Sequence, residues 1–201
     1  MNTPLKSTKN AQAGCLLIFG AVWTIGSAAM TIDVFSSSPL GALLPAAFVL
    51  LGLCMIWAGL KPMIAVRKIG AAQIILSVEA PRVGEKFLVN YQQTAQSPVS
   101  VLNHTMTLIF RESATYTRGS NTTTVTHPTT VNTISYGPLA LRPGETNQRQ
   151  WSIQIPADGM HSFEGRRNKL NWVIQTKVTM AGWPTYEEEF PFTVTPDRLG
   201  G

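Results

Sequence analysis

The sequence predicts a membrane α-helical hairpin followed by an all-β domain that folds as an antiparallel sandwich. Two observations indicate the hairpin: a pair of uncharged apolar segments of spanning length, and the Lys and Arg residues that flank them. A third indicates the sandwich: from about Ala72 onward, apolar residues alternate with polar ones, with no amphipathic helical pattern between them. Such alternation, broken by regular turn signals, is typical of about seven or eight strands.

The first spanning helix is expected at residues 13–32, after an N-terminal tail at 1–12. No charged residue lies between Lys9 and Asp33, and about 20 apolar residues suffice to cross the bilayer core as a helix. Ser27-Ala28-Ala29 also resembles the small-residue cleavage site of a signal peptide, so removal of this segment stays open as an alternative.

The second spanning helix is expected at residues 40–60. A polar turn at 33–39, closed by the helix-initiating Pro39, separates it from the first, and a basic joint at 61–71 follows it. Small residues occur along both helices and let helix backbones approach closely in lipid. They favour a hairpin packed on itself, and the alternative is a docking face for another membrane protein.

The orientation of the hairpin follows from its flanking charges. Lys6 and Lys9 precede the first helix, and the basic residues of the joint follow the second: Lys61, Arg67 and Lys68. The turn between the helices has no Lys or Arg, so the positive-inside rule places both termini in the cytoplasm. We therefore expect a two-pass protein of a plasma or bacterial inner membrane, with the joint residues contacting anionic lipid headgroups.

The β-domain is expected at residues 72–196, with a short tail at 197–201. Its clearest strands carry apolar residues at alternate positions around Trp151, Trp172 and Phe190. The expected core comprises Trp151, Ile153, Trp172, Ile174, Phe190 and Phe192, with Phe163 packing its turn against them. Residues 119–135 are rich in Thr and poor in large apolar groups, which predicts an exposed edge hairpin or a long loop. Pro128 would hinder pairing of that edge with another chain.

The distribution of charge argues against nucleic-acid binding. Charged residues make up only 13% of the chain, which also excludes a disordered, highly charged arm. The net charge of +5 arises mainly beside the apolar helices, because residues 72–201 carry eleven basic and ten acidic residues. A nucleic-acid-binding domain would concentrate Lys and Arg on its folded surface.

The search for reactive groups predicts no catalytic residue, no cofactor and no metal. The sequence lacks a phosphate-binding loop, a His-Glu-x-x-His motif and a nucleophile elbow, and Cys15 and Cys54 fall in the apolar helices. The best alternative is a metal-binding or enzymatic loop at His161, which has Asp158 and Glu164 within three residues. Met106 near His104 and Met160 beside His161 could add soft metal ligands, although Met in a β-core is commoner.

A basic run at Arg166-Arg167-Asn168-Lys169 is the candidate recognition site. It follows Gly165 and precedes a strand, so Arg166, Arg167 and Lys169 should stand at a strand-connecting tip. A partner protein or lipid headgroups could bind these cations. In the acidic run Glu187-Glu188-Glu189, at least one carboxylate should face solvent beside a basic neighbour.

Part of the β-domain resembles one lobe of an arrestin-like protein. The resemblance rests on a Pro-Gly turn in Leu141–Glu145, a strand ending in Pro in Trp151–Pro156, Ser162-Phe-Glu-Gly165, and an aromatic strand in Leu170–Ile174. Glu189–Val194 resembles the last strand of such a lobe, and the arrangement as a whole is similar to poorly characterised bacterial membrane proteins. The resemblance implies an immunoglobulin- or arrestin-like sandwich and a non-enzymatic adaptor, but no phosphate-binding residue, because the chain has room for one lobe.

The sequence therefore favours a membrane-tethered interaction module with a cytoplasmic β-sandwich, bound to membrane lipid and to a protein partner. The alternative is an accessory subunit of a larger membrane complex that docks through the helical hairpin.

Overall fold

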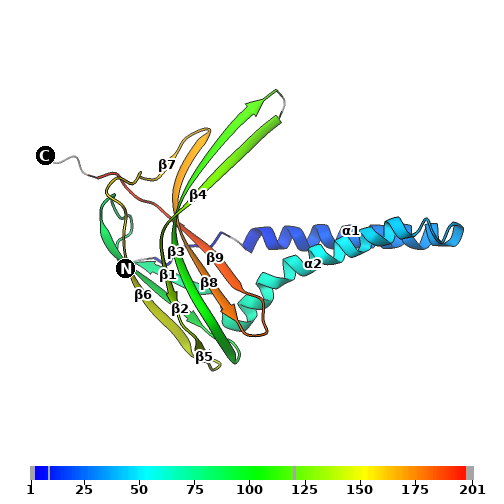
Figure 1. Ribbon diagram of the computed structural model, residues 1–201, viewed down its shortest axis with the longest axis horizontal. Helices are drawn as coiled ribbons and strands as arrows, with labels where there is room; N and C mark the ends of the chain where they lie inside the picture. Colours follow the sequence, from blue (N-terminus) through cyan, green and yellow to red (C-terminus); the bar gives the residue numbers. More distant parts are fainter. Residues whose placement is uncertain (1–2, 9, 120, 198–201) are drawn as a thin grey trace. The chain divides into compact units, whose positions relative to one another are not determined.

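The chain divides into two compact units, each described by itself (Figure 1). The computed structural model describes residues 3–8, 10–119 and 121–197. One unit is the helical hairpin at residues 9–66. The other joins the N-terminal residues up to Thr8 with the chain from Arg67 onward.

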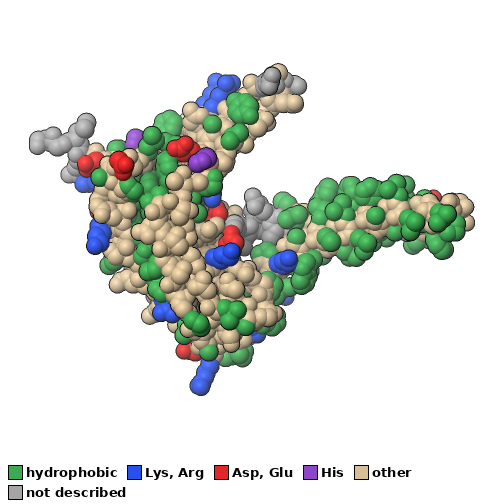
Figure 2. Space-filling view, viewed as in Figure 1, with side chains coloured by type: hydrophobic (Ala, Val, Ile, Leu, Met, Phe, Trp, Pro, Cys, Tyr) green, Lys and Arg blue, Asp and Glu red, His purple; other side chains and the backbone are tan. Residues whose placement is uncertain are grey.

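Two long apolar helices form the hairpin. Helix α1 extends from Asn10 to Ser37 and helix α2 from Leu43 to Ile69, and both are long and apolar enough to cross a bilayer. Their outward side chains are mostly apolar, as Figure 2 shows, and Ile25 is 71% exposed. Water solvates such a surface poorly, whereas lipid chains solvate it well.

The turn of the hairpin is shorter than expected because α1 continues through Ser37. The hydroxyls of Ser36 and Ser37 donate hydrogen bonds of 2.7 and 3.1 Å to the carbonyls of Asp33 and Val34. These bonds add to the backbone hydrogen bond of 2.7 Å that the Ser38 N–H donates to the Val34 carbonyl. Polar residues that suggested a turn therefore close the helix instead.

The second helix also differs from the expectation at both ends. It begins at Leu43 rather than at Leu40, with Pro45 in its first turn, where the missing N–H costs little. The residues expected as a joint continue α2 through Pro62 to Ile69. The residue after the helix, Gly70, has a φ of 83°, which glycine adopts without the steric cost that a Cβ atom would add.

Small residues bring the two helices of the hairpin together. A Cβ atom on Gly52 would lie 2.2 Å from Thr24 Oγ1, and one on Gly20 would lie 3.0 Å from Ile56. The Thr24 hydroxyl donates to the carbonyl of Gly20 at 2.7 Å, which satisfies it without water. The hairpin thus packs on itself at these positions.

Two antiparallel sheets form the second unit, which confirms the predicted sandwich. The smaller sheet has the order β1-β2-β6, with β1 at Ala72–Leu76, β2 at Lys86–Thr94 and β6 at Thr146–Gln154. The larger sheet has the order β4-β3-β8-β7, with β5 paired to β3 and β9 to β8. Its strands are β3 Val99–Arg118, β4 Asn121–Tyr136, β5 Leu139–Leu141, β7 Phe163–Glu164, β8 Asn168–Met180 and β9 Tyr186–Phe192.

The core lies between these sheets, as the alternation of apolar residues predicts. All six core residues expected from the strands are buried: Trp151, Ile153, Trp172, Ile174, Phe190 and Phe192. The expectation for Phe163 is wrong, because its side chain is 49% exposed. It lies on a two-residue strand that pairs with the outer end of β8, where the core has already ended.

The N-terminal segment lies against the edges of both sheets. The Leu5 N–H donates to the carbonyl of Ile74 on β1 at 2.8 Å, and the Thr8 N–H donates to that of Glu189 on β9 at 3.2 Å. This part of the expected tail is therefore bound to the sandwich. It supplies donors to strand edges that would otherwise be open to solvent or to another chain.

Candidate interaction surface

The inner face of the larger sheet extends beyond the smaller sheet. Along β3, burial falls from Leu108, which is fully buried, to Glu112 and Ala114, which are exposed although they face the same side. The β3–β4 hairpin projects away from the rest of the sandwich in Figure 1. In the described part of the chain, no second sheet therefore lies over this part of the inner face.

A groove of about 380 Å³ lies on this uncovered face. We name six residues of its lining the distal shelf: Glu112, Ala114, Val125, His127, Phe163 and Leu170. Val125 and Phe163 are 52% and 49% exposed, so apolar side chains that continue the core pattern meet solvent here. Glu112 and His127 lie opposite each other across the β3–β4 pair and form its polar part.

The predicted cationic loop stands at one end of the shelf, in the turn between β7 and β8. The Gly165 N–H donates to the carbonyl of Asn168 at 2.8 Å, and the Thr115 N–H of β3 donates to that of Arg167 at 2.6 Å. A Cβ on Gly165 would lie 2.8 Å from the Phe163 ring, so glycine lets the turn close over that ring. Arg166 and Arg167 are exposed, as the sequence predicts.

Lys169 differs from its two neighbours because it is paired. Its Nζ lies 3.1 Å from Glu164 Oε2 across the β7–β8 pair. Both side chains are well exposed, so the pair contributes little to stability, but it neutralises one of the three expected cations. Arg166 and Arg167 therefore carry the positive charge of this tip.

The expected lipid-contact residues Lys61, Arg67 and Lys68 all belong to α2. Lys61 Nζ lies 5.9 Å from the ring centroid of Trp57, one turn earlier in the helix. Lys68 Nζ lies 4.3 Å from the ring of Trp183, in the turn between β8 and β9. Both are cation–π contacts.

Sequence reasoning missed a polar layer inside the sandwich, around His104 on β3. His104 is 1% exposed; its Nε2 lies 3.0 Å from Thr176 Oγ1, and its ring centroid lies 4.4 Å from that of Tyr91. Burial lowers the pKa of His104 to about 4, and the Arg149 charge acts in the same direction. The imidazole is therefore neutral at physiological pH, and it packs in the core with Thr176 as its hydrogen-bond partner.

The same layer holds the chain where α2 leads into β1. The Gln93 side chain accepts a hydrogen bond from the Tyr91 hydroxyl and donates to the Gly70 carbonyl at 2.8 Å. Tyr186 Oη accepts a bond of 2.7 Å from the Ala72 N–H. Burial raises the pKa values of both tyrosines, so neither ionises in the physiological range.

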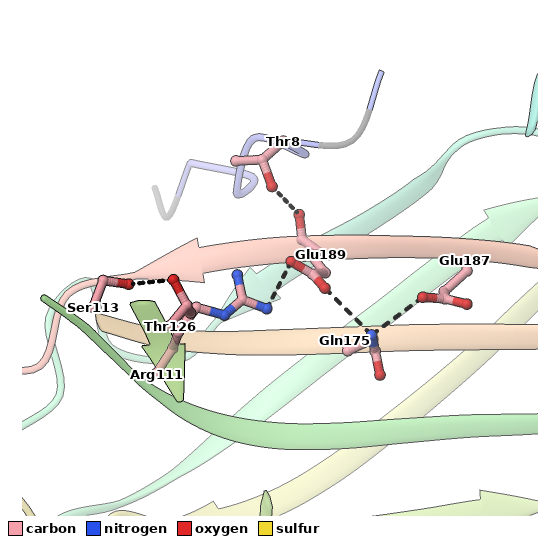
Figure 3. A network of polar contacts seen from close by, with 7 residues as sticks. All are labelled: Thr8, Arg111, Ser113, Thr126, Gln175, Glu187 and Glu189. Atoms are coloured by element: carbon pink, nitrogen blue, oxygen red, sulfur yellow. Dashed lines mark hydrogen bonds and ion pairs between the residues drawn. The ribbon is translucent and has the colours of Figure 1, made fainter. Parts of the chain in front are cut away.

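The acidic run on β9 alternates as expected, but its middle residue points inward. Glu188 is 4% exposed, and burial raises the pKa of its carboxyl, opposed by the hydroxyls of Tyr186 and Ser7. Glu189 has the basic neighbour that was expected: Arg111 Nη2 lies 3.0 Å from its Oε2 (Figure 3).

The histidines do not assemble a metal site in the part of the chain that the structure describes. There, no three His, Cys, Asp or Glu side chains gather closely enough to hold an ion. His161 and Met160 are exposed in the loop before β7, whereas Met106 is fully buried in the core beside His104.

Comparison with known proteins gives a likeness of fold. No protein-family model matches the chain, and no curated protein matches it. A crystal structure of Spo0M, a sporulation control protein from Bacillus subtilis, is similar with a TM-score of 0.49 and 14% sequence identity. The similarity covers 61% of this chain and 48% of that one, so the chain spans about half the length of Spo0M. The fold and the surface define an antiparallel β-sandwich protein that carries two long apolar helices.

Proposed function

We propose that this protein is a membrane-anchored, non-enzymatic interaction module whose distal shelf binds a segment of a partner protein. The observation that carries the proposal is the uncovered inner face of the larger sheet, where Val125 and Phe163 are half exposed beside a groove. Exposed apolar side chains with a polar rim are typical of protein-binding surfaces.

The charges around the shelf suggest what the partner carries. Arg166 and Arg167 stand at the end of the groove, and the pairing of Lys169 with Glu164 leaves them as the cations of the tip. A partner segment with apolar residues for the groove and a carboxylate beyond them would complement both features. Such charges mainly raise the association rate and fix the orientation of binding.

The helical hairpin is the membrane anchor in this proposal. Its two helices are long and apolar enough to span a bilayer, and the flanking Lys and Arg residues favour a cytoplasmic sandwich. The N-terminal segment bonds to the sandwich through Leu5 and Thr8, which supports an arrangement with both ends of the hairpin on the same side of the membrane. Two spanning helices give that arrangement.

Site-specific photo-crosslinking tests the proposal in native membranes. A photoreactive phenylalanine analogue replaces Phe163 on the shelf or, as the control, Ser152 on the exposed face of β6. We expect a defined protein adduct from position 163 alone, and loss of that adduct in Arg166→Glu/Arg167→Glu. The matched charge control is Lys86→Glu/Arg142→Glu, which reverses two exposed cations elsewhere and should keep the adduct. Equal adducts from positions 163 and 152, or adducts with lipid alone, would contradict the proposal.

A further inference from the structure

Among the strands that the structure describes, none pairs with the outer edge of β4. β4 stands at the end of the larger sheet and pairs with β3 on one side. The Thr115 N–H points toward the β8 side, where it donates to the Arg167 carbonyl. The residues of β3 on either side of Thr115 therefore direct their backbone N–H and C=O groups toward β4. The residues of β4 opposite this set are Thr123, Val125 and His127.

The intervening residues of β4 consequently direct their backbone groups away from the sheet. These are Thr122, Thr124 and Thr126, followed by Pro128, which has no N–H to offer. A proline in a strand is tolerated where its nitrogen faces away from the neighbouring strand, as it does here. The edge from Asn121 to His127 thus presents a regular series of donors and acceptors that ends at Pro128.

This stretch lacks the features that usually prevent edge pairing. Asn121–His127 contains no Lys, Glu, Asp, Arg or Pro, and Thr and Val favour extended strands. On the opposite side of the sandwich, Leu5 and Thr8 of the N-terminal segment bond to the edges of β1 and β9.

We propose that two copies of this protein associate by antiparallel pairing of their β4 edges over residues 121–127. With Thr124 opposite its own counterpart, Thr122 faces Thr126 of the other copy, and each such pair exchanges two backbone hydrogen bonds. The pairing is isologous, so it closes as a dimer. Pro128 ends the paired stretch, because it cannot donate to a neighbouring strand.

The side chains suit a second copy on both faces of the joined strands. On one face, hydroxyls already pair across β3 and β4, at 2.9 Å between Thr115 and Thr124 and 3.1 Å between Ser113 and Thr126. Pairing continues this series of hydroxyls into the other copy. On the other face, Val125 lies beside Thr123 of the other copy, and no charge meets a like charge, because the stretch carries none.

Disulfide trapping of the full chain in its membrane tests this dimer. Thr122→Cys/Thr126→Cys is built in a Cys15→Ser/Cys54→Ser background and oxidised with diamide. Residues in a bonded antiparallel pair have Cα atoms about 5.5 Å apart, which suits a disulfide, whereas positions 122 and 126 of one chain lie about 13 Å apart. We expect a covalent species of twice the chain mass. Thr117→Cys, one strand inward at the same tip, is the control for random collision.

Substitutions at Thr124 separate edge pairing from other association. Thr124→Pro removes an outward N–H and should reduce the crosslink to the level of the Thr117→Cys control, whereas Thr124→Ala keeps that N–H and should preserve it. Thr124→Lys leaves the backbone intact and places two like charges opposite each other, so it should also weaken the crosslink and do so less at high salt. An unaltered crosslink in both Thr124→Pro and Thr124→Lys, absence of the double-mass species, or an adduct with a different protein would overturn the proposal.

Discussion

Arg111 on β3 and Glu189 on β9 form an ion pair that reaches across β8, with 3.0 Å between Arg111 Nη2 and Glu189 Oε2 (Figure 3). Gln175 of β8 lies between them and donates to both Glu189 and Glu187 at 3.3 Å. The backbone carbonyl of Glu189 also accepts the Thr8 N–H, so one residue of β9 connects the N-terminal segment with three strands of the sheet. The two charged side chains are only 25% and 13% exposed.

We expect Arg111→Ala to destabilise the sandwich by about 1–2 kcal/mol, because it removes a charged hydrogen-bond donor from a mostly buried carboxylate. Arg111→Lys keeps the charge but loses the planar geometry, so it should cost less. Thermal unfolding of Arg111→Ala, of Glu189→Gln and of the double variant Arg111→Ala/Glu189→Gln measures the coupling. Additive losses in the double variant would show that the ion pair contributes nothing.

Trp172→Ala should destabilise the sandwich by about 3–5 kcal/mol, the usual cost of removing a buried aromatic ring. Trp172 is 1% exposed, packs on Phe110 and donates from Nε1 to the Met160 carbonyl at 2.9 Å. Phe163→Ala removes an aromatic ring that is half exposed and should change stability little. Limited proteolysis of the two variants in parallel measures the difference, and equal protection would refute it.

The stability of the sandwich should fall as the pH is lowered from about 6.5 to about 4, because of His104. Burial depresses the pKa of His104 to about 4 in the folded chain, so the unfolded chain binds a proton in this range that the folded chain does not. The loss attributable to His104 should approach roughly 3 kcal/mol at the lower end. Glu188 acts in the opposite sense, because its raised pKa favours the folded state when the carboxyl is protonated.

His104→Gln isolates this contribution, since it introduces a side-chain amide that can bond to Thr176 but does not titrate. The difference in unfolding midpoint between wild type and variant should therefore depend on pH below about 6.5 and be constant above it. Parallel curves across the whole range would mean that His104 is accessible to protons in the folded chain.

Gly52→Val should loosen the helical hairpin, whereas Gly26→Val should be tolerated. Position 52 has no room for a side chain beside Thr24, while a Cβ on Gly26 would have no atom within 4 Å. Both substitutions make an apolar helix slightly more apolar, so insertion into the membrane should be unaffected. Resistance of the detergent-solubilised protein to heat and protease compares them. Similar losses in both variants would place Gly26 in a packed interface.

Reporter fusions should show the turn of the hairpin outside and the C-terminus inside. The positive-inside rule predicts this from the basic residues at the ends of α1 and α2 that lie away from the turn. A reporter active only after export should work at Ser36 and fail at the C-terminus, and a cytoplasmic reporter should give the reverse. An exported C-terminal reporter would refute the predicted topology.

Local patterns in the sequence were enough to predict the two helices, the sandwich and most of its core. Alternation placed Trp151, Trp172 and Phe190 correctly, because a strand with one buried face repeats its environment every second residue. The same reasoning predicted exposure of Arg166 and Arg167, since a glycine turn between strands is a local feature. It failed for Phe163, whose exposure depends on where the opposite sheet ends.

The sequence by itself determined which segments are apolar helices, which are strands and where the basic residues gather, because these properties repeat over a few neighbouring residues. Only the tertiary structure decided that Lys169 is paired, that His104 and Glu188 are buried and that Leu5 and Thr8 bind strand edges. It also decided that the larger sheet extends beyond the smaller one and leaves the distal shelf open. The physical reason is that burial and pairing depend on residues far apart in the chain, and a sheet edge is covered or open according to what the rest of the chain brings to it.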